Sequence, residues 1–81
     1  MKLYTYNGKC NISGDRVRMA RVKNGLSQEK LAARLQLMGV QIGQNAISRI
    51  EVGKRVVPDF EIILFAEVLG VSTDWLLGKD G

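Results

Sequence analysis

The sequence has no histidine and only one cysteine, Cys10, among its 81 residues. An intramolecular disulfide is therefore impossible, and zinc sites built from cysteine and histidine are excluded. The side chain that enzymes most often use for acid–base chemistry is also missing, which argues against an enzyme. We accordingly expect no catalytic residue, no metal and no cofactor.

Long apolar stretches are absent as well. No run approaches the roughly 18 to 20 residues that a helix needs to cross a bilayer, so no membrane segment is expected. Residues 1–14 are of mixed polarity and lack the pattern of a secretory signal, which predicts a cytoplasmic protein. Apolar residues make up 46% and charged residues 25% of the chain. This composition and length are typical of one globular domain.

The charges that are present are unevenly distributed. Residues 1–55 carry eleven basic and three acidic side chains, a net charge of +8. Residues 56–81 carry one basic and five acidic side chains, a net charge of −4. This asymmetry suggests one face for a polyanion, usually nucleic acid, and another face directed away from it. An unevenly charged solvated surface is the alternative, and charge alone does not choose between the two.

Capping side chains and helix-ending glycines divide most of the chain into five short predicted helices. These span approximately 15–24, 28–38, 44–52, 59–69 and 73–77. Either Ser13 or Asp15 is expected to cap the first helix, and Asp59 the fourth. Apolar residues surround most of the fourth helix, which predicts that it is the central and most buried one.

The first twelve residues have a different pattern. Asn7 and Gly8 form the dipeptide most typical of a two-residue type I′ hairpin turn. Leu3–Tyr6 and Lys9–Ile12 would be its two arms. An isolated hairpin is only marginally stable in water, so this one must dock on the helices or remain loose.

Residues 16–77 resemble the phage repressor and Cro-like helix-turn-helix domains, the lambda-repressor-like regulators of the XRE type. The resemblance rests on four ordered blocks: GLSQEKLA at 25–32, ISRIE with GKR at 47–55, PD at 58–59 and LGVSTDWLL at 69–77. It implies an all-α, five-helix DNA-binding domain over residues 15–78, preceded by a short arm or hairpin over residues 1–14. Double-stranded DNA would be the partner.

The resemblance also indicates which side chains meet the DNA. The third helix would enter the major groove, where glutamine and asparagine can bind adenine and arginine can bind guanine. The expected base-reading residues are Gln44, Asn45, Ser48 and Arg49. The expected phosphate-binding residues are Gln28, Lys54 and Arg55. Arg21 and Glu51 match a pair that such domains use as a structural salt bridge.

The spacing inside the motif departs from the family pattern. Ala32 and Ile47 are fifteen residues apart, about five more than in the usual motif. The extra residues must lie within Gln36–Gly43, and we expect them to lengthen the second helix by about a turn and to enlarge the following connection.

The leading hypothesis is a sequence-specific DNA-binding transcriptional regulator, a repressor that binds a pseudo-palindromic operator as a homodimer. Dimer assembly could depend on DNA, with an interface from the last helix, the arm or exposed apolar residues such as Ile63 or Val68. The alternative is an antitoxin-like or protein-interaction module on the same fold, in which DNA binding is secondary. A small enzyme is a third, less favoured hypothesis.

Overall fold

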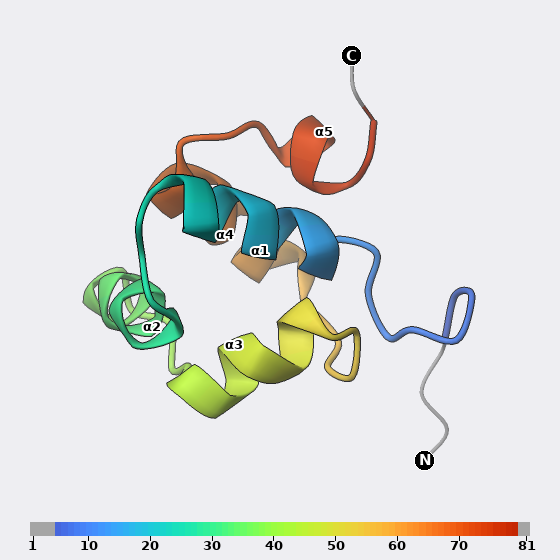
Figure 1. Ribbon diagram of the computed structural model, residues 1–81, viewed down its shortest axis with the longest axis horizontal. Coiled ribbons are helices and arrows are strands. Elements are labelled where there is room, and N and C mark those ends of the chain that lie inside the picture. The colour runs from blue at the N-terminus through green and yellow to red at the C-terminus, as the bar shows by residue number, and fades with distance from the viewer. Residues whose placement is uncertain (1–4, 80–81) are drawn as a thin grey trace.

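The computed structural model describes residues 5–79 and shows five helices packed around one core (Figure 1). The helices are α1 (Gly14–Lys23), α2 (Gln28–Leu37), α3 (Gln44–Glu51), α4 (Asp59–Leu69) and α5 (Thr73–Leu76). Within the described residues the only β-type pairing is an isolated bridge. The predicted all-α, five-helix fold is confirmed. The α1 helix begins one residue inside the predicted arm.

The helix ends follow local chemistry, with two corrections. Ser27 caps α2, its Oγ accepting a hydrogen bond from the backbone N–H of Lys30 at 3.1 Å. The Ser13 side chain makes no capping hydrogen bond to α1, and Asp15 lies inside that helix. Asp59, the predicted cap of α4, lies one residue inside that helix, because Pro58 occupies the N-cap position.

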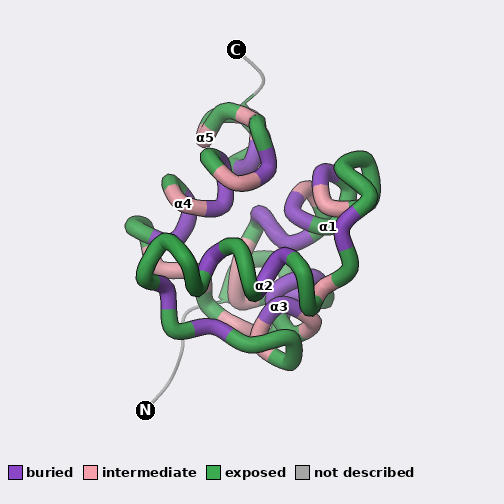
Figure 2. Tube along the Cα trace, turned by 90° about the vertical axis from the view of Figure 1, so that its left-hand side faces the viewer, coloured by how far each residue is buried: buried purple, intermediate pink, exposed green. Residues whose placement is uncertain are grey.

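The core consists of buried apolar side chains from every helix and from the connections between them (Figure 2). Its fully buried members include Val17, Leu31, Leu35, Ile47, Ile50, Phe65 and Leu76. The α4 helix supplies Ile62, Phe65, Ala66 and Leu69 to this core. Its opposite side is not buried, contrary to the prediction, because Phe60 is 59% and Ile63 54% exposed.

The extra residues of the motif lie mainly in the connection between α2 and α3. The α2 helix ends at Leu37, and the six residues 38–43 that follow are not helical. Val40 and Ile42 are buried, and the Gln36 side chain donates a hydrogen bond to the carbonyl of Ile42 at 2.7 Å. The insertion is therefore held against the core, and only a small part of it extends the helix.

The predicted hairpin turn is present and docks on the helices. Asn7 and Gly8 both have positive φ, and Tyr6 and Lys9 exchange backbone hydrogen bonds of 2.8 and 3.0 Å. The backbone N–H of Cys10 then donates to the carbonyl of Gly53, just after α3, at 2.7 Å. Lys2, Leu3 and Tyr4 lie outside the described residues.

Candidate nucleic-acid interface

The α3 helix has one buried side and one polar, solvent-facing side, and it lies at the edge of the molecule (Figure 1). Ile47 and Ile50 are fully buried. Since these anchors fix the rotation of the helix about its axis, the remaining positions are held outward. Gln44, Asn45 and Arg49 are exposed and Ser48 is half-buried. These are the four residues predicted to read bases.

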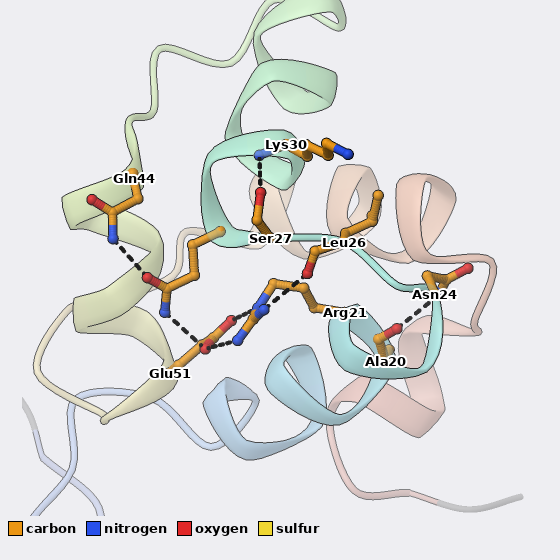
Figure 3. Close-up of polar contacts among 9 residues, drawn as sticks. Ala20, Arg21, Asn24, Leu26, Ser27, Lys30, Gln44 and Glu51 are labelled. Atoms are coloured by element: carbon orange, nitrogen blue, oxygen red, sulfur yellow. Dashed lines mark hydrogen bonds and ion pairs between the residues drawn. The ribbon is translucent and has the colours of Figure 1, made fainter.

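A chain of hydrogen bonds connects the starts of α2 and α3 to α1 (Figure 3). The Gln44 amide nitrogen donates to Gln28 Oε1 at 2.7 Å. Gln28 Nε2 in turn donates to Glu51 Oε1 at 3.1 Å. Glu51 accepts two further hydrogen bonds from the Arg21 guanidinium, at 2.6 and 3.0 Å. Arg21 also donates to the carbonyl of Leu26 at 2.9 Å.

The predicted Arg21–Glu51 pair is thus present and largely removed from solvent. The side chains of Arg21 and Glu51 are 13% and 3% exposed. The hydrogen bonds to Glu51 and its charge raise the pKa of Arg21, while burial opposes the rise. Because both charges are satisfied, the pair fixes how α1 meets the end of α3.

The contact to Gln28 leaves Gln44 with the groups that adenine requires. A glutamine amide has two N–H donors and one carbonyl oxygen, and a bidentate contact with adenine uses one donor and the oxygen. One donor of Gln44 is taken by Gln28. The second donor and the oxygen have no partner among residues 5–79. Gln44 is therefore oriented by Gln28 and still able to bind a base.

The two basic residues after α3 have different surroundings. Lys54 is exposed, and its ammonium group contacts no acidic side chain in the described part of the chain. Arg55 instead pairs with buried Glu61, at 3.0 Å between Nη1 and Oε1. Arg49 bends toward the same connection and donates to the carbonyl of Lys54 at 3.3 Å. Of the predicted basic pair, only Lys54 is fully available to a phosphate.

Asn11 is a polar residue of this region that sequence analysis did not identify. Its Nδ2 donates to the carbonyls of Ile50 and Arg55, at 3.1 and 2.7 Å. Its Oδ1 accepts the backbone N–H of Gly14 at 2.8 Å. Asn11 lies two residues before Ser13, the N-cap of α1, and its two bonds to a segment about forty residues away leave no trace in the local sequence.

Within the described residues the structure offers neither a metal site nor a membrane-spanning helix. No three histidine, cysteine, aspartate or glutamate side chains lie close enough together there to hold a metal ion. None of the five helices has the length and apolar character required to cross a bilayer.

The fold and the outward face of α3 define a helix-turn-helix protein. The sequence model of the family described as Helix-turn-helix matches residues 17–76. The chain belongs to this family. No curated protein sequence gives a significant match to it.

Two solved structures are similar to the chain over most of its length. One is the P22 c2 repressor protein in complex with a synthetic operator, at 24% identity and a TM-score of 0.72, with 86% of this chain and 98% of the repressor chain covered. The other is the DNA-binding domain of BldD, at 22% identity and a TM-score of 0.72, with 90% of this chain and 99% of that chain covered. At these identities the likeness establishes the lambda-repressor-like fold.

Proposed function

We propose that this chain is a sequence-specific regulator of transcription, a repressor that reads the major groove of double-stranded DNA with α3. The observation that carries the proposal is the polar outer face of α3, where Gln44 is held by Gln28 and keeps a donor and an acceptor for a base. The operator-bound state of the structurally similar P22 c2 repressor supports the same assignment.

Each predicted site residue receives a role in this proposal. Gln44, Asn45, Ser48 and Arg49 face the bases. Gln28 and Lys54 contact the phosphates on either side of α3. A phosphate bound at Gln28 would also meet the positive end of the α2 dipole. Arg55 supports the segment after α3 through Glu61 and lies beside the phosphate contact. Arg21 and Glu51 maintain the geometry, and the protein acts in the cytoplasm without cofactor, metal or enzymatic activity.

The protein would bind a pseudo-palindromic operator as a homodimer, one copy on each half-site. Phe60 and Ile63 form an exposed apolar patch on α4, one helical turn apart. This patch follows directly on the connection that carries Lys54, so it lies at the margin of the proposed DNA-binding face. A second copy covering it would bring two DNA-binding faces together. Val68, the other residue considered from the sequence, is half-buried against the core.

Selection of bound sites from a random duplex library tests the proposal. The wild type should enrich a two-fold symmetric motif, and its affinity should fall steeply as salt rises because phosphate contacts release counterions. The Gln44→Ala/Asn45→Ala variant should lose the motif while remaining folded. Retention of the motif by this variant would contradict the role of α3. Absence of any motif in the wild type, together with a protein captured as partner, would favour the protein-interaction module.

A further inference from the structure

The N-terminal segment 5–13 lies outside the matched family region, yet it contacts the C-terminal end of α3. The family model begins at residue 17, whereas Asn11 binds the carbonyls of Ile50 and Arg55. In Figure 1 this segment leaves α1 and runs beside the end of α3 and the connection to α4. The contact therefore joins the start of the chain to one border of the proposed DNA-binding face.

Asn11 closes the segment 50–55 into a fixed loop. The last carbonyls of a helix have no partner within the helix and are satisfied from outside it. The carbonyl of Ile50 accepts the backbone N–H of Gly53 at 3.0 Å in addition to its bond from Asn11. Here one amide group binds two carbonyls that lie five residues apart, at the two ends of this loop. The carbonyl of Gly53, between them, accepts the backbone N–H of Cys10 at 2.7 Å. Lys54 lies inside the region that these three hydrogen bonds hold.

Close packing reinforces the same contact. Gly14 approaches α3 so nearly that an added Cβ would overlap the carbonyl oxygen of Ile50. Lys9 lies over Gly53, where an added Cβ would be 2.9 Å from its Cγ and Cδ atoms. Gly14 and Gly53 thus allow the N-terminal segment to lie directly against the backbone at the end of α3. The position of this segment and the positions of the α3 end and of Lys54 therefore depend on one another.

We propose that Asn11 is a positioning residue for DNA binding, which holds Lys54 at the place where it meets a phosphate while α3 occupies the groove. This inference rests on the proposed function. Without the hydrogen bonds from Asn11, the loop would gain conformational freedom, Lys54 would no longer be held at the phosphate, and the affinity would fall. The bases read by Gln44 would stay the same, since the opposite end of α3 is held by Gln28.

The test compares Asn11→Ala with Ser72→Ala in the full chain, on the duplex selected by the wild type. Ser72 caps α5 by accepting the Trp75 backbone N–H at 3.0 Å, so its loss destabilises the fold away from the interface. We expect Asn11→Ala to weaken binding about tenfold and to reduce the slope of log affinity against log salt by about 0.9, one phosphate contact. Ser72→Ala should keep the wild-type affinity and slope at a temperature where both variants are folded.

Combination with Lys54→Ala separates positioning from general stability. Once Lys54 is removed, Asn11→Ala should cause little further loss of affinity, because both changes remove the same contact. The inference would be overturned if the affinity losses of Asn11→Ala and Lys54→Ala multiply in the double variant. A wild-type salt slope in Asn11→Ala would overturn it as well. If the wild type selects a motif and Asn11→Ala binds it equally well, only the inference fails. If the wild type binds no duplex, the proposed function fails with it.

Asn11→Asp provides a second variant in case Asn11→Ala does not fold. Aspartate retains the acceptor for Gly14 and removes both donors to α3 and its loop. Ile12→Asp places the same charge on the adjacent exposed residue and leaves the hydrogen bonds from Asn11 to Ile50 and Arg55 intact. Weaker binding by Asn11→Asp than by Ile12→Asp supports the inference, and equal binding by the two variants overturns it.

Discussion

Gln44 at the start of α3 donates a 2.7 Å hydrogen bond to Gln28 at the start of α2. The two residues are sixteen positions apart, on either side of a connection longer than the usual motif has. Because this bond joins the two ends of the connection, the starts of α2 and α3 are held in a fixed relative position. Under the proposed function, Gln44 at a base and Gln28 at a phosphate would then meet the same duplex in one orientation.

Gln28→Ala should therefore weaken base recognition as well as phosphate binding. We expect Gln44→Ala to reduce discrimination at one base pair by about 1 to 3 kcal/mol. Gln28→Ala should produce part of the same loss, because Gln44 becomes free to rotate. Binding to duplexes substituted at each position of the selected motif measures this. The exposed Gln41→Ala serves as control, and an unchanged base preference in Gln28→Ala would contradict the coupling.

Glu51→Ala should destabilise the fold by about 3 kcal/mol, because it leaves the Arg21 guanidinium largely buried without its partner. Replacing both residues, as Arg21→Met/Glu51→Leu, should recover much of that loss. Denaturant unfolding of the two single variants and the double variant measures the coupling. Equal losses in Glu51→Ala and the double variant would show that the charge pair itself is not the cause.

The contribution of the Arg21–Glu51 pair to the stability of the fold should not change with pH over the neutral and mildly alkaline range. The hydrogen bonds to Glu51 and the charge of Glu51 raise the pKa of the Arg21 guanidinium in the folded state. A raised pKa stabilises the fold below the unfolded-state pKa, and this stabilisation is lost only as pH rises through the folded-state pKa. The stability difference between wild type and Arg21→Met should therefore be equal at about pH 7 and pH 10. A marked decrease at the higher pH would disprove this assignment.

Gly53→Ala and Gly39→Ala form a matched pair of substitutions. Both glycines have positive φ, +82° and +90°, so alanine costs about 1 to 2 kcal/mol at either position. Only Gly53 faces another residue, Lys9, and its substitution should cost more than that of Gly39. Thermal unfolding measures both losses. Adding Lys9→Ala removes the Cγ and Cδ atoms and leaves Cβ at 3.1 Å, so it should relieve part of the excess at Gly53. An unchanged excess would mean that these two atoms are not the cause.

Lys54→Ala and Arg55→Ala should affect different properties. Lys54→Ala should lower the salt slope of DNA binding by about 0.9 and leave stability unchanged within about 0.5 kcal/mol. Arg55→Ala leaves the buried Glu61 carboxylate without its partner and should cost about 2 kcal/mol of stability. Denaturant unfolding and salt titration distinguish the two. The reverse pattern would show that Arg55 is the phosphate contact.

Phe60→Ser should weaken cooperative binding to the full palindrome and leave binding to a single half-site unchanged. The reason is that it reduces the apolar area available to a second copy. Leu37→Ser is the control, since Leu37 is 89% exposed on a different helix. Sedimentation with full and half-site duplexes measures both effects. Equal cooperativity in the wild type and Phe60→Ser would exclude this patch as the interface.

Local patterns predicted much of the fold. Serine caps and helix-ending glycines marked the helices, and the ordered blocks around Gly25 and Ile47 identified the family. The hairpin turn at Asn7 and Gly8 was equally clear, because both residues tolerate positive φ. Burial around most of α4 was predicted wrongly, although the exposure of Ile63 was expected. An apolar sequence alone does not show which face of a helix lacks a neighbour.

The parts of the candidate site that depend on distant contacts were harder to predict. Nothing in the sequence near Arg55 indicates that its guanidinium forms an ion pair with Glu61. In the same way, Asn11 resembles an ordinary residue before a helix until the α3 end is placed beside it. Side-chain type and helical spacing give the direction in which a residue points, whereas its partner is set by tertiary packing.

The anchoring of α3 by Asn11 also has a consequence for the order of folding during synthesis. Asn11 leaves the ribosome before its partners, because the carbonyls it binds belong to residues 39 and 44 positions later. Until those residues emerge, the N-terminal hairpin has nothing to dock on, and such a hairpin is marginal on its own. Contacts between distant positions also form slowly, because a long loop must close first. The hairpin at Asn7 and Gly8 therefore reaches its final position only after α3 has been translated.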